Sequence, residues 1–244
     1  MAAMDRFEVN VREVLANAFT QQREKMQDVA LRMCDCVTGG GMLYVFGTGH
    51  AHMLAEELFY RAGGLAAVTP ILEERLMLHV SASRSSQVER EHGYAEDLLK
   101  RYPMKQGDML IVCSNSGRNA VPVELAMLAR ERGATVVALT NVRHSQSCEP
   151  RNQMKRRLME VSDVVLDNFG CVGDASVEMT DGRRVGATST VVGAAILEAI
   201  VCQCVELALE LGKMIDVFAS SNVDEGDNIN EVILEKYRPR IKFL

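Results

Sequence analysis

The 244-residue sequence contains no tryptophan, and aromatic side chains make up only 5% of it. Flat rings on which nucleic-acid bases or sugar rings could stack are therefore scarce. There is no long run of basic residues, and the formal net charge is −6, so we expect no nucleic-acid-binding surface. Hydrophobic residues (48%) and charged residues (25%) occur in ordinary proportions, which excludes an intrinsically disordered chain.

The N-terminus also lacks the basic segment and apolar run of an export signal. The odd number of cysteines, seven, most of them in apolar patterns, predicts reduced thiols and a cytoplasmic protein rather than a disulfide framework. One apolar stretch, 191–211, is long enough to cross a membrane. Glu198, Gln203, Glu206 and Glu210 interrupt it, so we interpret it as a buried core helix and expect no membrane partner.

Short apolar segments alternate with helical ones through the middle of the chain. Strands that are apolar on both faces and separated by helices indicate a parallel sheet covered on both sides. The pattern predicts strands at 42–46, 66–72, 109–113, 135–140 and 163–167, and helices at 51–62, 86–101, 120–132 and 190–211. Pro70 predicts that the strand 66–72 lies at an edge of the sheet.

The N-terminal segment 5–37 has the apolar spacing of one long amphipathic helix, with a possible break near Gln21 and Gln22. At 1.5 Å per residue it would be a rod of about 45 Å, and its surplus apolar face predicts a subunit interface. A last helix is expected near 228–237. We find no internal repeat or linker. The sequence therefore predicts one domain over 1–244, made of an N-terminal interface helix (5–38), an α/β core (40–211) and a tail (212–244).

Ligands of such sheets bind at the carboxyl ends of the strands, and three loops there carry polar side chains. The first follows the strand 109–113 and has hydroxyls, a glycine and the start of a helix, which together suit a phosphate. Its residues are Ser114, Asn115, Ser116, Gly117, Arg118 and Asn119. The alternative is a simple helix-capping turn with Ser116 or Asn119 as the cap.

The other two loops are Gly47-Thr48-Gly49-His50-Ala51-His52 and Thr188-Ser189-Thr190. The former lacks the third glycine of a dinucleotide-binding fingerprint. His50 and His52 are candidates for acid–base groups or, less simply, for metal ligands, and otherwise are surface or capping histidines. The three hydroxyl residues can cap the helix that follows or bind a sugar phosphate. We expect neither a metal nor a cofactor to be required.

At these loops the sequence resembles the sugar isomerase (SIS) domain family. The Ser114 loop resembles the S-x-S-G-x-[ST] phosphosugar loop of that family, and 188–190 resembles the hydroxyl cluster of arabinose-5-phosphate isomerases. The similarity runs from about 40 to 211 and implies a three-layer α/β/α fold with a five-stranded parallel sheet of the flavodoxin type. The whole chain, including His50-Ala51-His52 and 237–242, resembles the UPF0309 group of uncharacterised bacterial SIS proteins.

One branch of the family, the phosphoheptose isomerases, implies catalytic residues. Ala55-Glu56-Glu57-Leu58 with Arg61 resembles the A-E-E-L-x-x-R segment of that branch, whose second glutamate is the catalytic base. The resemblance therefore gives this role to Glu57 and makes Arg61 a site residue. The segment 90–94 resembles another stretch of that branch that carries an acid in the same site, which makes Glu91 a further candidate.

The late helix of that branch also carries a catalytic histidine, and residues 188–211 contain none. The partner acid must then come from elsewhere in the chain or be absent. The candidates are His50, His52, His79 and His92, whereas His144 is assigned to the basic loop that follows residue 141.

The resemblance implies a phosphosugar-binding protein, and the preferred reaction is aldose–ketose isomerisation through a cis-enediol. The alternatives are a lyase, etherase or deglycase that acts on a phosphorylated amino sugar, and a sensor without catalytic activity. The expected partners are a small sugar phosphate and further copies of the chain, in a homodimer or homotetramer with sites at the subunit interfaces.

Overall fold

The computed structural model describes the whole chain, Met1–Leu244. Its centre is a parallel sheet of five strands in the order β2-β1-β3-β4-β5. All five predicted strands are present, and the strand with Pro70 lies at an edge, as predicted. Their bounds are β1 (Leu43–Gly47), β2 (Val68–Ile71), β3 (Met109–Cys113), β4 (Thr135–Thr140) and β5 (Val164–Asp167).

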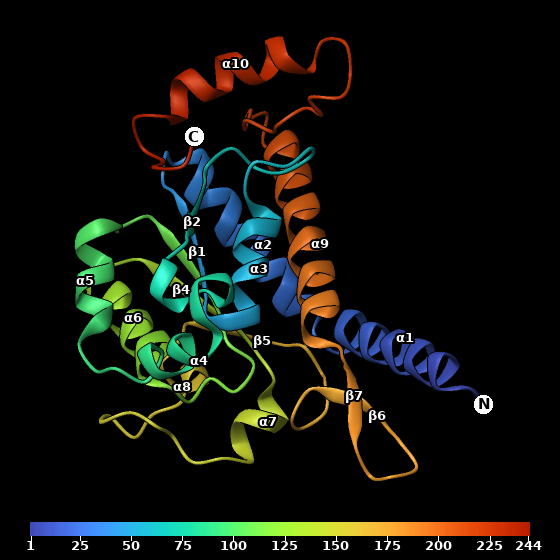
Figure 1. Cartoon of the computed structure of the whole chain (residues 1–244). Coiled ribbons are helices and arrows are strands. Elements are labelled where there is room, and N and C mark those ends of the chain that lie inside the picture. Colours follow the sequence, from blue (N-terminus) through green and yellow to red (C-terminus); the bar gives the residue numbers. More distant parts are fainter.

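Helices cover both faces of the sheet (Figure 1). Alternate residues of β1 show why: Leu43 and Val45 join one apolar cluster with α2, α3 and α9, while Tyr44 and Phe46 join a second with α5, α6 and α10. This arrangement confirms the predicted three-layer α/β/α fold. The helices are α1 (Ala3–Gln21), α2 (Arg23–Thr38), α3 (Met53–Leu58), α4 (Leu78–Val88), α5 (Tyr94–Arg101), α6 (Ala120–Glu131), α7 (Val142–Gln146), α8 (Leu158–Val161), α9 (Ser189–Glu210) and α10 (Gly226–Tyr237), with 3-10 turns η1 (Gly49–His52) and η2 (Glu74–Leu76).

The long N-terminal helix is broken at Gln22, where the backbone leaves helical geometry (φ −131°). The buried side chain of Gln22 is the physical reason. Its amide donates to the carbonyl oxygen of Asp167 at 2.7 Å and accepts from the Asp167 N–H at 2.8 Å, which ties the break to the end of β5. The expected straight rod is therefore wrong, and the possible break is confirmed: α1 leaves the body of the molecule, whereas α2 packs on the sheet (Figure 1).

Two other predicted helices are also divided. The segment 86–101 contains the end of α4 and the whole of α5, separated by a turn at 89–93 in which Gly93 has φ +79°. The segment 51–62 becomes η1 followed by α3, which ends at Leu58. The first residue of this turn, Glu89, still has the helical backbone geometry of α4 (φ −55°, ψ −22°).

A β-hairpin, which no sequence pattern predicted, lies between β5 and α9. Its strands are β6 (Ala175–Glu178) and β7 (Arg184–Ala187), which pair antiparallel. The hairpin packs against α1, where Asn10 donates to the carbonyl oxygen of Ser176 at 2.9 Å. Figure 1 shows α1 and the hairpin extending together away from the sheet.

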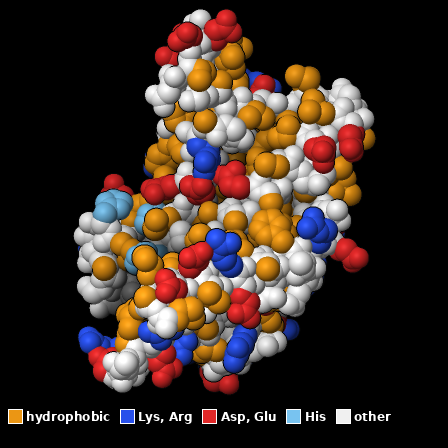
Figure 2. Space-filling view, turned by 90° about the vertical axis from the view of Figure 1, so that its right-hand side faces the viewer, with side chains coloured by type: hydrophobic (Ala, Val, Ile, Leu, Met, Phe, Trp, Pro, Cys, Tyr) orange, Lys and Arg blue, Asp and Glu red, His pale blue; other side chains and the backbone are white.

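By length and composition α9 could cross a membrane, and 44% of its most apolar window is buried within the chain. It packs along α2 and also contacts α1 and α3. The outer face around α1 and α9 carries exposed apolar side chains, and Figure 2 shows hydrophobic atoms spread over it beside groups of acidic ones. The exposed members on these two helices are Met4, Val9, Val191 and Leu209.

Candidate functional site

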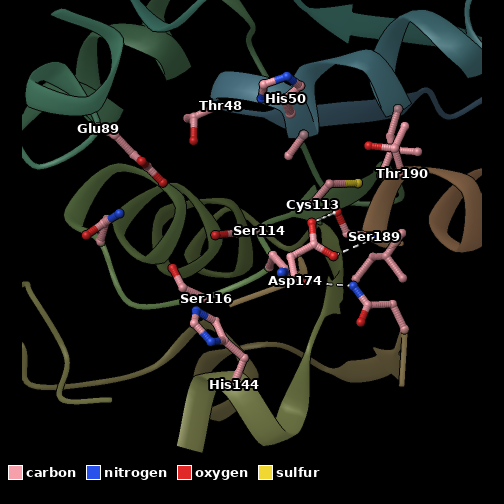
Figure 3. Close-up of a pocket in the computed structure, with 16 residues that line it drawn as sticks. Thr48, His50, Glu89, Cys113, Ser114, Ser116, His144, Asp174, Ser189 and Thr190 are labelled. Carbon is pink, nitrogen blue, oxygen red and sulfur yellow. Dashed lines mark hydrogen bonds between the residues drawn. The ribbon is translucent and has the colours of Figure 1, made fainter. Parts of the chain in front are cut away.

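A cavity of about 260 Å³ lies at the carboxyl ends of β1 and β3. Here the strand order reverses, since β1 continues to β2 on one side and lies beside β3 on the other. A crevice at such a point is the usual ligand position of this sheet type. Figure 3 shows side chains from several separate segments around it.

Eight of the predicted site residues line this cavity, and nine do not. Those that line it are Thr48, His50, Ser114, Asn115, Ser116, Asn119, Ser189 and Thr190. Those absent from its lining are Gly47, Gly49, His52, Glu57, Arg61, Glu91, Gly117, Arg118 and Thr188. The structure thus brings the three predicted loops together but leaves the predicted base outside the cavity of a single chain.

The loop after β3 is held in one shape from behind. The Gly117 N–H donates to Oγ of Ser114 at 3.2 Å, and Oγ1 of Thr140 donates to the Ser114 carbonyl oxygen at 2.7 Å. Gly117 has φ +56°, and a Cβ there would lie 3.2 Å from Oγ1 of Thr140, so another residue would be strained and glycine is favoured. The backbone N–H groups of Asn115 and Ser116 donate to no acceptor in the chain. They remain open to a ligand.

Asn119 is at the N-cap position of α6, but its side chain makes no capping hydrogen bond. Its Oδ1 is buried and has no partner, although the residue lines the cavity. Buried polar atoms are nearly always paired, so an unpaired acceptor here points to a missing ligand donor. The positive end of the twelve-residue helix α6 lies at the same place. The simple capping role considered for Asn119 is therefore wrong.

The loop after β1 brings its backbone close to the following turn. A Cβ on Gly47 would lie 2.3 Å from the carbonyl oxygen of Ala51, so only glycine fits. Thr48 and the exposed His50 face the cavity. His52 is buried instead, with Nδ1 against the Gly49 carbonyl oxygen and Nε2 3.8 Å from a carboxylate oxygen of Glu56.

The turn before β6 supplies a carboxylate that the sequence analysis did not identify. Asp174 accepts hydrogen bonds from the Thr188 N–H at 3.1 Å, the Ser189 N–H at 2.9 Å and Oγ of Ser189 at 2.6 Å. It thereby caps α9 and fixes the Ser189 hydroxyl at the cavity wall (Figure 3). The sequence signal for this contact was weak: Gly173-Asp174 precedes Thr188-Ser189-Thr190 by 14 residues.

The same turn holds His144, which sequence analysis assigned to a basic loop. The Gly173 N–H donates to Nδ1 of His144 at 3.0 Å, and the imidazole ring lines the cavity beside Ser116 (Figure 3). Backbone geometry supports this position, because the His144 N–H donates to Oδ1 of Asn141 at 2.7 Å and so begins α7.

Glu89 is the other carboxylate in the cavity lining. It follows α4 directly, and its carbonyl oxygen accepts from the Val121 N–H at 3.1 Å, which ties this turn to α6. Its carboxylate extends into the cavity (Figure 3) and has no hydrogen bond or ion pair in the chain. The predicted Glu91 lies two residues further on, where its carboxylate is 3.3 Å from the Arg75 guanidinium.

Glu57 and Arg61 form an ion pair on α3 and the turn after it, outside the cavity. Arg61 also lies 3.2 Å from Oε1 of Glu198 on α9. Burial raises the pKa of Glu198 above its usual value, while Arg61 lowers it and Glu57 raises it further. These three residues, Glu57, Arg61 and Glu198, are called the ion cluster below.

The cavity lining contains no lysine or arginine. Its ionisable groups are Glu89, Asp174, His50, His144 and the thiol of Cys113. Burial raises the pKa of Cys113 to about 12, so this thiol stays protonated and is a poor nucleophile. No group of three or more His, Cys, Asp or Glu side chains is arranged to hold a metal ion.

Comparison with known proteins agrees with this architecture. The SIS domain model matches residues 6–141. A UPF0309 protein of Shouchella clausii is 39% identical over the whole of both chains, and one of Listeria innocua is 38% identical over 95% of this chain and 94% of its own. The chain therefore belongs to the SIS domain family and, within it, to the UPF0309 group.

Solved structures of low sequence identity share the fold. A phosphoheptose isomerase from Francisella tularensis gives a TM-score of 0.56 at 13% identity, with 84% of this chain and 98% of that chain covered. The Vibrio vulnificus NanR protein complexed with ManNAc-6P gives 0.53 at 18% identity, with 98% of this chain and 69% of that chain covered. The chain therefore shares its fold with a phosphoheptose isomerase and with the NanR protein.

Proposed function

We propose that the cavity binds a sugar phosphate, with the phosphate on the loop that follows β3. The observation that carries the proposal is the pair of open N–H groups at Asn115 and Ser116, which lie beside the serine hydroxyls at the positive end of α6. Amides, hydroxyls and a helix N-terminus bind phosphate without a cationic side chain. This agrees with a lining that contains neither lysine nor arginine.

The remaining lining groups suit the hydroxyls of the sugar. Oδ1 of Asn119 needs a donor, and the hydroxyls of Thr48, Ser189 and Thr190 offer both donors and acceptors. A volume of about 260 Å³ is slightly below the range of pockets for drug-sized ligands. A small phosphorylated sugar fits this chemistry and size.

The reaction that we propose is aldose–ketose isomerisation through a cis-enediol, in which a base moves a proton between adjacent carbons. Two neighbours in fold are phosphoheptose isomerases by name, which supports this class. Glu57, with Arg61, is the base implied by family resemblance, and Glu91 is the weaker candidate. Because both lie outside the cavity lining, a role for either requires a site completed by another subunit.

A sensor without catalytic activity is the second candidate. It is favoured by the fold shared with NanR, whose structure holds a phosphorylated amino sugar.

The exposed apolar side chains on α1 and α9 support association into a homodimer or homotetramer across that face (Figure 2). Sedimentation of the purified protein tests this association, and a monomer at micromolar concentration would contradict it.

Ligand binding is tested with a panel of aldose and ketose phosphates, each beside its unphosphorylated sugar, in a thermal-shift assay. We expect stabilisation by phosphorylated members only. Ser116→Asp, which puts a carboxylate where the phosphate binds, should weaken that binding by about tenfold or more because the two negative charges repel each other. Ser86→Asp, on the exposed side of α4, is the matched control. Equal binding by both variants would refute the phosphate position.

A further inference from the structure

The carboxylate of Glu89 lies in the cavity, yet nothing in the chain stabilises it. The residue is half-buried, its side chain makes no hydrogen bond, and no lysine or arginine lines the cavity. No cation or hydrogen-bond donor of the chain therefore occupies this carboxylate. An unpaired carboxylate kept beside a ligand site suits a proton acceptor.

His144 reaches the same cavity with its ring orientation fixed. Its Nδ1 accepts a hydrogen bond from the Gly173 N–H at 3.0 Å, so the neutral imidazole carries its proton on Nε2. Asn141 accepts from the backbone N–H of His144 and holds the start of α7 in place. The Nε2–H is therefore the donor that the ring offers to a ligand, next to Ser116 (Figure 3).

His50 is a weaker candidate for this acid. It is exposed and makes no hydrogen bond through its ring, so nothing in the chain fixes its orientation or its tautomer. Glu57 is the corresponding weaker candidate for the base, because Arg61 already neutralises it outside the cavity. Glu89 is the lining carboxylate that has no partner, since Asp174 is occupied by Thr188 and Ser189. His144 is the lining imidazole whose orientation is fixed.

We propose that Glu89 is the catalytic base and His144 the catalytic acid for sugar phosphates bound in this cavity. In Figure 3 the two side chains enter from opposite sides, with Ser114 and Ser116 between them. A sugar phosphate anchored on the serine loop would therefore present its reacting carbons between a proton acceptor and a proton donor. This inference rests on the proposed function, because it assigns the residues that perform the isomerisation.

The proposed isomerisation moves two protons and leaves both Glu89 and His144 in their starting protonation states. Glu89 takes the proton from the carbon next to the carbonyl, and the electron pair of that C–H bond forms the carbon–carbon double bond of the enediol. The carbonyl oxygen takes the Nε2 proton of His144, and the neighbouring hydroxyl returns a proton to that nitrogen, so the imidazole ends neutral. Protonated Glu89 then delivers its proton to the other carbon, which leaves the isomeric carbonyl. A neutral histidine that polarises a carbonyl is an established arrangement in other isomerases.

The experiment measures exchange of carbon-bound protons with deuterium in D₂O by NMR, on the sugar phosphates that bind in the thermal-shift panel. Glu89→Gln should slow exchange about 10²- to 10⁴-fold, the usual contribution of a general base, while its dissociation constant stays within about threefold of wild type. Glu96→Gln, the same change at an exposed position on α5, is the control and should leave exchange unaltered.

His144 is tested with two amides, because removing the imidazole could disturb the turn that it holds. Asparagine places an oxygen near the position of Nδ1 and can still accept from Gly173, whereas glutamine places an N–H near the position of Nε2. We expect His144→Asn to slow exchange by about 10²-fold or more with an unchanged melting temperature. His144→Gln should retain part of the wild-type exchange rate.

Each outcome separates the two levels of the proposal. If no sugar phosphate binds, both the proposed function and the catalytic assignment fail. Binding by the wild-type protein without exchange keeps the phosphosugar site and overturns the acid–base assignment, as expected of a sensor. Exchange that survives both Glu89→Gln and His144→Asn, or that Glu57→Gln or His50→Gln abolishes in their place, overturns the assignment but keeps the isomerase.

Discussion

The cavity and the ion cluster hold carboxylates in opposite ways. In the ion cluster, Arg61 lies between Glu57 and Glu198, so positive charge faces both carboxylates. In the cavity, Glu89 faces no cation at all. The two carboxylates of the ion cluster share one guanidinium within the fold, whereas the cavity leaves a carboxylate without a cation and several donors for something outside the chain.

The two regions also differ in how firmly they are built. Each side chain of the ion cluster is about one-third or more exposed, and salt bridges at such positions are worth little. The loop after β3 in the cavity is held from behind by hydrogen bonds to backbone and buried amides, such as the bond from Asn168 to Asn115 at 2.7 Å. This firmly held loop also contains the open N–H groups of Asn115 and Ser116 and lies beside the unpaired Oδ1 of Asn119, which is the arrangement expected of a prepared ligand site.

The largest expected effect comes from removing the support of the cavity at Asp174. Asp174→Ala leaves two N–H groups at the start of α9 and the Ser189 hydroxyl without their acceptor. We expect a loss of about 1–3 kcal/mol in the free energy of unfolding, measured by urea denaturation, together with weaker sugar-phosphate binding.

Asp174→Asn is the matched control, because its side-chain oxygen can still accept from the Thr188 and Ser189 N–H groups. It should retain most of the stability. If alanine is as stable as wild type, the turn before β6 does not support the cavity and the contrast between the two regions is lost.

The features that the sequence predicts correctly, the strands and the serine loop, depend on residues that are close together in the chain. The five strands and the loop Ser114–Asn119 were found because apolar runs, glycine and hydroxyl residues carry their signal locally. Pro70 placed its strand at the edge for the same reason, since proline lacks the N–H that an interior position would use.

The residues that the sequence analysis missed act through contacts over long sequence separations. His144 is oriented by Gly173, which is 29 residues away, and Asp174 bonds to Ser189, which is 15 residues away. Glu89 is tied at its carbonyl oxygen to the N–H of Val121, which is 32 residues away. Periodicity over a single segment contains none of this information.

The smallest expected effect lies in the ion cluster and concerns pH. The pKa of Glu198 is raised, chiefly by burial, so the folded state binds a proton here more tightly than the unfolded state does. The resulting contribution to stability is fully present below the unfolded pKa of about 4.3 and is lost as pH rises through the folded pKa. Glu198→Gln should therefore raise the melting temperature at pH 7 by roughly 1–2 °C, with no gain below about pH 4.

Glu57→Gln separates charge from packing in this prediction. It removes the neighbour that raises the pKa of Glu198 and leaves Arg61 free to pair with Glu198 alone. The pH dependence of the melting temperature between about pH 4 and 7 should then be shallower than in the wild-type protein. If it is unchanged, the two carboxylates are not coupled through Arg61. The ion cluster would then be three independent surface charges, and its contrast with the unpaired Glu89 would lose its physical basis.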